Sequence, residues 1–457
     1  MIAVGLRYKL VFSFSRQSRQ ANWIRSQNRP QFVRQPFQSS PCRLIINTLK
    51  DFIATLSLAL KNVIRQRRRS LPGVVAVALG ITSLILASGF IEWNLRFGRE
   101  STIHSQLGHI RVYKAGYREA GAGNPFAYLV PNQEQQLRII KKQSHIVAVA
   151  PRLSFNGLIS HGDSTLSFIG EGVAPDEERV LSQSVTLVQG EPLTSTDPDG
   201  IMLGQGLAAN LGAKPGDTVV LLANTASGGL NAVQGRVRGL FRTITKAYDD
   251  SALRTTITMA RQLVRVAGST SYALVLDNTE HTDATVTALR QRLQAEQLEF
   301  VPWYELADFY NKTAKLFSRQ VDVLRAIIAV IIILSISNSM MMGVLERTSE
   351  IGTAMALGTS RGGVLRQFLV EGALLGVLGG LFGLMIGYVA AKLISVIGIP
   401  MPAPPGMAFG YTAGILLSWP TALKAVILAI ATTLTASVYP AWKASRMNIV
   451  DALRHGR

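Results

Sequence analysis

The sequence predicts a membrane protein of four transmembrane α-helices, with a large α+β domain inserted between helices 1 and 2. Four windows of 18 to 22 residues contain no Asp, Glu, Lys or Arg. Each is close to the roughly 20 residues that an α-helix needs to cross a bilayer. The long segment between the first two windows mixes strand and helix patterns, and an excess of positive charge precedes the first window. The windows are Ser70 to Ile91, Ala326 to Leu345, Gly372 to Ala391 and Ala425 to Trp442.

The N-terminal region carries most of the chain's net charge of +19: residues 1–70 hold 14 Lys or Arg and one acid. The excess ends in "RQRRR" immediately before the first window, which places the N-terminus in the cytoplasm. Few aromatic residues that could stack on bases interrupt this region, so we expect no nucleic-acid partner. Residues 1–48 read as a basic, disordered cytoplasmic arm. A transit peptide, or a true start further downstream, remains an alternative.

The domain boundaries follow from the windows and the flanking charges. Four crossings return the C-terminus to the cytoplasm, and the segment 393–423 contains no charge. Apolar residues recur every four positions from Phe52 to Ile64, which predicts an amphipathic helix on the inner membrane surface. We expect a juxtamembrane helix at 49–69, transmembrane helices at 70–92, 323–345, 365–392 and 421–442, a periplasmic α+β domain at 93–322, a cytoplasmic helix at 346–364, a short periplasmic loop at 393–420 and a cytoplasmic tail at 443–457.

The segment 93–322 is nearly neutral, with 23 basic and 22 acidic residues, as expected of a folded domain outside the membrane. Segments 109–115, 218–223 and 272–277 have strand patterns, whereas 132–143 and 280–296 have the pattern of amphipathic helices. The block from 200 to 222 predicts strand, helix, turn and strand. This is an α+β domain, either single or divided into two lobes.

The sequence contains no pattern that indicates catalysis, a cofactor or a metal ion. "GQGLAANLG" does not fit a dinucleotide-binding loop, and no phosphate-binding loop occurs. "GTSRG" follows a helical pattern and not the strand that a nucleophile elbow requires. The histidines show no i, i+3 or i, i+4 pairing with one another. We therefore expect no catalytic residue, no cofactor-binding residue and no metal site, and the single Cys42 allows no intramolecular disulfide.

The connection 346–364 has its own helical pattern, with a face formed by Ile351, Ala354, Met355 and Gly358. Glu350 precedes that face, where a negative charge suits a helix N-terminus, and Gly358 is placed to end the helix. This face lacks the bulk for insertion into a lipid surface, which favours docking to a partner over lying on the membrane.

Glycines are frequent in the third predicted span, at spacings of four residues that let helices pack at short distance. Both adaptable and static packing are compatible with this pattern. In the second span, Asn338 is polar at membrane depth, so we expect it to face another helix. The residues expected to pack closely are Gly372, Gly376, Gly380 and Gly383.

Two segments resemble the FtsX-like permease family, the membrane subunits of type VII ABC transporters. They are "MMMGVLERTSEIGTAMALGTSRGGVLRQFLVEGALLGVLGGLFGLMIG" and "YPAWKASRMNIVDALRHG". The resemblance, which extends over about residues 49–457, implies a non-catalytic subunit of the bacterial inner membrane that pairs with a second permease subunit. It also implies that a separate cytoplasmic ATPase binds the ATP and docks on a coupling helix. The implied docking residues are Glu350, Ile351, Ala354, Leu357 and Gly358.

Within the family, the inserted segment is similar to that of the lipoprotein-releasing permeases LolC and LolE and of MacB-like exporters. Lipoprotein release implies contact with membrane lipid, a lipoprotein and a periplasmic carrier. It also implies a lipid-accommodating space lined by apolar residues of the outer domain and of the stretch from Leu86 to Phe90. MacB-type efflux of peptides or drugs, and FtsX-type signalling to a cell-wall hydrolase, are the alternatives.

Overall fold

The computed structural model describes residues 57, 59, 61, 65, 67–121, 123–131, 134–293, 297–403, 407 and 409–454. The predicted arm at 1–48 lies outside the described residues, as does most of the predicted juxtamembrane helix at 49–69. Both therefore stay predictions.

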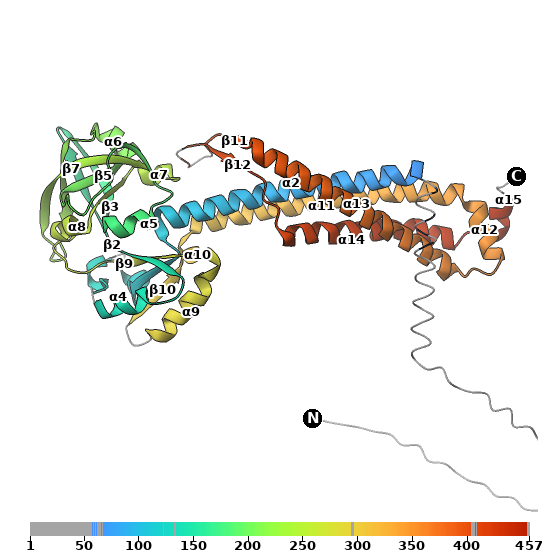
Figure 1. Cartoon of the computed structure of the whole chain (residues 1–457), viewed down its shortest axis with the longest axis horizontal. Helices are drawn as coiled ribbons and strands as arrows, with labels where there is room; N and C mark the ends of the chain where they lie inside the picture. The colour runs from blue at the N-terminus through green and yellow to red at the C-terminus, as the bar shows by residue number, and fades with distance from the viewer. Residues whose placement is uncertain are drawn as a thin grey trace, which may run out of the picture. The chain divides into compact units, whose positions relative to one another are not determined.

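Four long helices form a bundle, and each is long and apolar enough to cross a membrane. They are α2 (Arg67–Thr102), α11 (Asp308–Glu346), α13 (Arg361–Ile397) and α14 (Trp419–Ser445). Their apolar side chains share one buried core, to which every helix contributes. The predicted class, four membrane helices with an inserted α+β domain, is confirmed (Figure 1).

Two of these helices extend well beyond the apolar windows. Helix α2 continues to Thr102, although the predicted span ends at 92, and α11 begins at Asp308, ahead of the predicted start at 323. Charged residues such as Arg96 and Arg99 end an apolar window, but they are good helix formers and do not end a helix. The inserted domain proper, residues 103–307, therefore stands on two helical extensions that pack side by side (Figure 1).

Three short elements complete the connections between the long helices. Helix α12 (Thr348–Ala356) joins α11 to α13, and a hairpin of β11 (Ile399–Met401) and β12 (Tyr411–Ala413) lies between α13 and α14. Helix α15 (Ile449–Arg454) follows α14 and packs against α12. The hairpin and α15 are additions to the predicted short loop and tail.

The inserted domain contains one ten-stranded sheet with two lobes. In the first lobe, β1 (Ile110–Lys114) pairs with β9 (Ser271–Leu276) and β10 (Leu298–Pro302), and β9 also pairs with the start of β2 (Ile146–His161). Side chains of α4 (Glu134–Lys141) and α9 (Thr282–Arg292) cover this part of the sheet and share its core. The strands predicted at 109–115 and 272–277 and the two predicted helices are confirmed.

In the second lobe, six strands pair in a closed ring. Strand β2 pairs with β3 (Ser164–Val173) and β6 (Thr218–Asn224), and the ring closes through β8 (Ala252–Thr256), β5 (Gly200–Gly204) and β7 (Leu230–Arg242). Its core includes residues of α6 (Gln205–Leu211) and α8 (Ile257–Val264). The remaining elements are η1 (Ile103–Leu107), α3 (Tyr117–Ala120), η2 (Pro125–Tyr128), α5 (Pro175–Leu181), β4 (Thr186–Gly190), α7 (Lys246–Asp249), η3 (Thr279–His281) and α10 (Trp303–Leu306).

Two rows of glycine let α13 approach two helices at once. A Cβ at Gly376 would lie 2.2 Å from the Thr433 Oγ1 of α14, and one at Gly383 would lie 2.6 Å from the Ala78 carbonyl oxygen of α2. The row toward α14 is Gly372, Gly376 and Gly380, and the row toward α2 is Gly379, Gly383 and Gly387. Since small residues permit this backbone approach in membranes, the two rows hold α2, α13 and α14 together.

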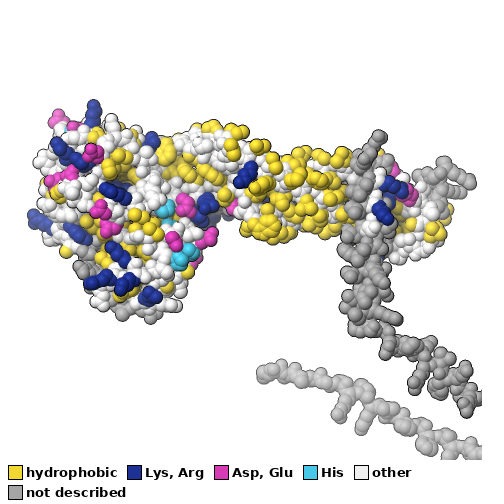
Figure 2. Space-filling view, viewed as in Figure 1, with side chains coloured by type: hydrophobic (Ala, Val, Ile, Leu, Met, Phe, Trp, Pro, Cys, Tyr) yellow, Lys and Arg dark blue, Asp and Glu magenta, His cyan; other side chains and the backbone are white. Residues whose placement is uncertain are grey.

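The surface of the bundle is apolar, as Figure 2 shows: hydrophobic side chains cover most of its visible face, whereas charges gather on the inserted domain. Helix α11 exposes a stripe of aliphatic residues at helical spacing. Asn338 lies in the same stripe and is also exposed. The aliphatic residues of this stripe are Val323, Ile327, Ile331, Leu334, Met342 and Leu345.

We predict that Gly383→Ala destabilises the bundle, whereas Gly380→Ala on the same helix does not. The added methyl at 383 meets backbone of α2 at 2.6 Å, but the one at 380 comes no closer to any atom than 3.4 Å, at the Cβ of Ala429. Overpacking of this kind costs about 1–3 kcal/mol. Thermal unfolding of the detergent-solubilised chain measures the difference. Equal melting temperatures for the two variants would refute close packing at 383.

Candidate functional site

Helix α12 is the short helix between two spanning helices, and its apolar face packs on its own chain. Ile351 is 7% exposed and belongs to the bundle core, and Met355 packs against that core. A Cβ at Gly352 would lie 2.7 Å from the Cβ of Ala452 on α15. In this conformation Ile351 is therefore covered by its own chain, and its predicted role in docking stays a prediction. The bundle core covers Ile351 and Met355, and α15 lies against Gly352.

The opposite side of α12 is open. Leu357 is 85% exposed, Gly358 is exposed and Ala354 is partly exposed. Glu350 lies on the same side, with its side chain 53% exposed, and it pairs with Arg65 at 3.0 Å. Four of the five predicted docking residues thus form one accessible surface, which we call the outer face of α12: Glu350, Ala354, Leu357 and Gly358.

The turn after α12 fixes where Leu357 points. The Gly358 N–H donates to the Met355 carbonyl at 3.1 Å, and the Thr359 N–H donates to the Ala354 carbonyl at 3.0 Å. These are the two bonds of a Schellman motif, which needs a left-handed residue at its centre. Gly358 supplies it with a φ of +103°. Ser360 then caps α13 by accepting from the Gly363 N–H at 3.1 Å.

A half-buried arginine joins this turn to the bundle. Arg347, whose side chain is 11% exposed, lies between α11 and α12 and pairs with Glu350 at 3.3 Å and with Glu371 of α13 at 3.5 Å. Its guanidinium also lies over the Phe368 ring, 5.9 Å from the centroid. One side chain therefore links α12 to both α11 and α13.

At the other end of the bundle, two arginines of the inserted domain hold the end of α2. Helix α2 finishes in the π-helical turn η1, whose last carbonyls lack partners within the helix. Arg111 of β1 donates to the carbonyls of Leu107 (2.8 Å) and Gln106, and Arg254 of β8 donates to the Ser105 carbonyl at 2.6 Å. Cations are favourable at a helix C-terminus. Both strands are thereby tied to α2.

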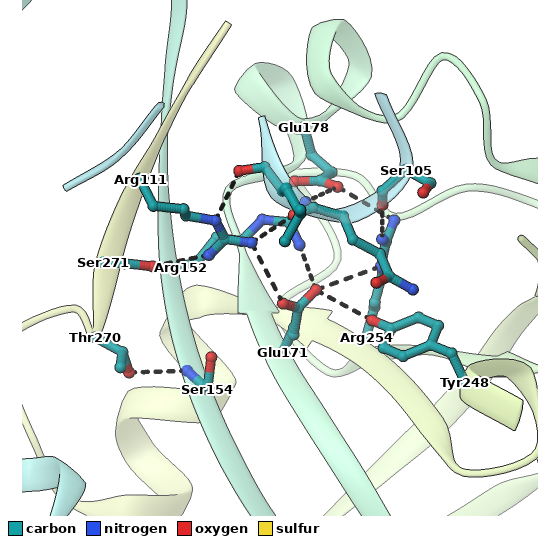
Figure 3. Close-up of polar contacts among 12 residues, drawn as sticks. Ser105, Arg111, Arg152, Ser154, Glu171, Glu178, Tyr248, Arg254, Thr270 and Ser271 are labelled. Carbon is teal, nitrogen blue, oxygen red and sulfur yellow. Dashed lines mark hydrogen bonds and ion pairs between the residues drawn. The ribbon is translucent and has the colours of Figure 1, made fainter. Parts of the chain in front are cut away.

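These arginines belong to a buried charge cluster, which Figure 3 shows. Arg152 of β2 is fully buried and pairs with Glu171 of β3 and with Glu178 of α5, the latter at 2.6 Å. Arg254 reaches Glu178 at 3.2 Å. Burial would raise the pKa of Glu171, but the three arginines outweigh it, so its pKa lies below the usual value. Three guanidinium groups thus face two carboxylates.

A cavity of about 970 Å³ opens where the extensions of α2 and α11 meet the inserted domain. Such a volume suits a small ligand or part of a larger one. Its wall combines charged residues (Glu92, Arg96, Arg99, Glu100, Asp322 and Arg325) with apolar ones (Ile91, Leu95, Val147, Val275 and Leu416). A smaller cavity of about 200 Å³ shares Ser88, Arg325 and Thr421 and continues toward Leu84, Ile85 and Leu428. Of the stretch 86–90 expected to line such a space, Ser88 does so.

A buried histidine lies at the wall of the cavity. The Nδ1 of His109 accepts from the Leu276 N–H at 3.1 Å, so its Nε2 carries the proton and donates to Thr279 Oγ1 at 3.2 Å. Burial lowers the pKa of His109 to about 4, with the neighbouring His104 acting in the same direction. At neutral pH this imidazole is uncharged and bridges β1 to the turn after β9.

The structure also brings together two groups of histidine and acidic side chains, although the sequence predicts no metal site. They are Glu100, His104 and His109, and His145, Asp277 and His281. The sequence signal for these groups is the i, i+4 spacing of Glu100 with His104 and of Asp277 with His281, which the spacing between histidines does not detect. The third member of each group becomes a neighbour through the fold.

Two family models match separate parts of the chain. Residues 323–449 match the FtsX-like permease C-terminal family, and residues 74–292 match the MacB-like periplasmic core domain. The first match contains α12 and α13, and the second contains most of the inserted domain.

Similar proteins span nearly the whole chain. The lipoprotein-releasing system transmembrane protein LolC of Xylella fastidiosa is 24% identical over 84% of this chain and 94% of its own length. The macrolide export ATP-binding/permease protein MacB of Sodalis glossinidius is 25% identical over 87% of this chain and 60% of its own length. The solved periplasmic region of MacB from Actinobacillus actinomycetemcomitans matches 44% of this chain and 92% of its own, with 16% identity and a TM-score of 0.32.

We predict that Arg152→Ala destabilises the inserted domain by about 3–5 kcal/mol, because it leaves two buried carboxylates short of a partner. Arg118→Ala is the matched control. Arg118 also pairs with two carboxylates, but its side chain is 40% exposed, and such pairs contribute about 0–1 kcal/mol. Thermal unfolding of both variants in detergent tests this. A comparable loss in the two would show that burial of the cluster is not decisive.

We predict that acidification weakens the inserted domain through His109. Its folded pKa of about 4 lies below the ordinary 6.5, so the unfolded chain binds more protons between these values. Stability is therefore present above pH 6.5 and is lost as the pH falls toward 4, by about 2 kcal/mol between pH 7.5 and 5. His109→Gln should flatten the melting temperature against pH. An unchanged slope in His109→Gln would contradict this assignment.

Proposed function

The chain belongs to the FtsX-like permeases of ABC transporters, and we propose that it transmits the motion of a separate ATPase to its MacB-like periplasmic core domain in order to release lipoproteins from the bacterial inner membrane. The observation that carries this proposal is the open outer face of α12, at the end of two spanning helices. The chain itself is then a non-catalytic subunit, and ATP is bound by its partner. Its N- and C-termini lie in the cytoplasm.

Docking of the ATPase at the outer face of α12 is supported by exposure and chemistry. Leu357 is an aliphatic side chain that is 85% exposed at the tip of a rigid turn, and burying such a side chain contributes about 1.5–3 kcal/mol. Glu350 beside it already pairs with Arg65 and Arg347, but its half-exposed carboxylate remains within reach of a basic partner residue. Ile351 would contribute indirectly, by holding α12 against the bundle core.

Transmission is supported by the continuity of the helices. Helix α11 runs without interruption from the inserted domain at Asp308 to the α12 turn at Glu346. Arg347 joins that turn to α13, which packs along α2 through its glycine row. The far end of α2 is held by Arg111 and Arg254. A push on α12 would thus reach the inserted domain through two parallel routes.

A lipidated cargo is supported by the cavity at the outer ends of α2 and α11. Its charged wall suits a polar head. The smaller cavity combines the apolar residues Leu84, Ile85 and Leu428 with the basic residues Arg325 and Lys424, so it suits the junction between an acyl chain and a negatively charged head. The relatives named for lipoprotein release match this chain over 94% and 93% of their own lengths. A periplasmic carrier would then accept the released lipoprotein.

A second permease subunit, identical or related, is supported by the exposed stripe of α11. Most of this stripe is aliphatic and would tolerate lipid, but Asn338 lies within it. A side-chain amide facing hydrocarbon without a partner is costly. A neighbouring subunit that covers α11 would remove this cost.

We predict that Leu357→Glu abolishes co-purification of the ATPase from cells while leaving membrane insertion intact, because it places a charge where an aliphatic contact is proposed. Val450→Glu is the matched control, since Val450 lies on the adjacent α15 and is 62% exposed. Undiminished recovery of the ATPase with Leu357→Glu would contradict the docking proposal.

The same pair of variants tests the cargo. With Leu357→Glu as the only copy, lipoproteins destined for the outer membrane should accumulate in the inner membrane, whereas Val450→Glu should sort them normally. Normal sorting combined with loss of peptide or drug export would replace lipoprotein release by MacB-type efflux.

A further inference from the structure

Two histidines of the inserted domain meet around one carboxylate, that of Asp277, away from the charge cluster. His145 immediately precedes β2, Asp277 follows β9 and His281 precedes α9. The Nδ1 of His145 lies 2.9 Å from Asp277 Oδ2, and the Nδ1 of His281 lies 2.8 Å from Asp277 Oδ1. The three side chains are each 40% to 47% exposed.

The backbone holds these three residues in place independently of their side chains. The Asp277 N–H donates to the His145 carbonyl at 3.1 Å, which extends the pairing of β2 and β9. The Asn278 side chain accepts from the Glu280 N–H at 3.0 Å, and the His281 N–H donates to the Asn278 carbonyl at 3.1 Å. His145 has a φ of +72°, which residues other than glycine seldom adopt. The arrangement is therefore set by the fold.

The chemistry of the donors distinguishes this group from the other one. The Nδ1 of His109 already accepts a backbone N–H, so its Nε2 keeps the proton and has no lone pair for an ion. In His145 and His281, by contrast, each Nδ1 faces a carboxylate oxygen, which can only accept. Each Nδ1 therefore carries a proton that can move to Nε2, and this frees both Nδ1 lone pairs on the same side as the carboxylate.

We propose that His145, Asp277 and His281 form a binding site for a divalent transition-metal ion of the zinc type. Two imidazole nitrogens and one carboxylate oxygen supply three ligands, and water completes a tetrahedral shell. The donor atoms lie within 4.8 Å of one another, and Zn²⁺ bonds of about 2.0–2.2 Å require only a small separation of the present contacts. Mg²⁺ and Ca²⁺, which prefer oxygen ligands, fit poorly.

An ion here would stiffen the rim of the cavity. Asp277, Asn278, Thr279 and Glu280 all line that cavity, and the ion would tie their turn to the loop before β2. The turn would then depend on the ion as well as on its hydrogen bonds. This consequence does not rest on the cargo or on ATPase docking.

Zinc titration of the intact chain tests the site. The full chain, without a polyhistidine tag and stripped with a chelator, is titrated with Zn²⁺ against a chromophoric competitor. We expect one site per chain, a higher melting temperature with Zn²⁺, and visible Co²⁺ absorption typical of four ligands. His281→Gln and Asp277→Asn should each weaken binding by about 100-fold or more, since loss of an outer-shell partner alone costs 10–100-fold.

Two variants serve as controls. His161→Gln removes a histidine that faces a single carboxylate, Asp217, at 3.5 Å, and His104→Gln removes a member of the other group; both should retain the site. Melting temperatures of the metal-free variants verify folding. Absence of a Zn²⁺ site, retention of full affinity in His281→Gln, or its loss in His104→Gln would each overturn the proposal.

Discussion

The buried arginines at the end of α2 are the constraint on which the rest of the structure depends. A buried guanidinium group is costly unless its charge is compensated, and the cluster offers two carboxylates, Glu171 and Glu178, to three arginines. The partial negative charge at the C-terminal end of a helix supplies the remainder. The end of α2 is thus part of the electrostatic balance of the inserted domain, and the two cannot separate without leaving a cation unpaired.

Close packing of α13 against two neighbouring helices is a second constraint on the bundle. The two glycine rows of α13 place α2 on one side and α14 on the other at backbone contact distance, so sliding of either helix would bring side chains into the glycine positions. Helix α11 is held differently. It contributes Ile332, Ile336 and Met340 to the core and leaves a long stripe exposed. Three helices therefore form a closely packed unit, and α11 packs on this unit through larger side chains.

The sequence predicts the spans, and with them the inserted domain, because a helix that crosses the hydrocarbon core needs about 20 predominantly apolar residues, and such stretches are visible in the sequence. Helix ends are less predictable, because Arg96 and Arg99 lie beyond the predicted span but are still part of helix α2. The helical pattern predicts an apolar face with Ile351 on the connection, but a single helix pattern does not identify what covers that face. Here the bundle core covers Ile351, and α15 lies against Gly352. The pairing that closes the six-stranded ring, and the meeting of His145 with Asp277, join segments far apart in the chain. No local pattern encodes them.

The burial of Ile351 and Met355 limits the surface of α12 that is available for docking an ATPase. With these residues packed on their own chain, the outer face holds one exposed aliphatic side chain, Leu357, and one charge, Glu350. Burying a single leucine contributes about 1.5–3 kcal/mol, and even a millimolar complex requires about 4 kcal/mol. One α12 is therefore too small an anchor by itself. If two permease subunits present two such helices to a joined pair of ATPases, the second contact forms at a high effective concentration and strengthens the complex. Docking at α12 then depends on the second subunit that is proposed to cover the exposed stripe of α11.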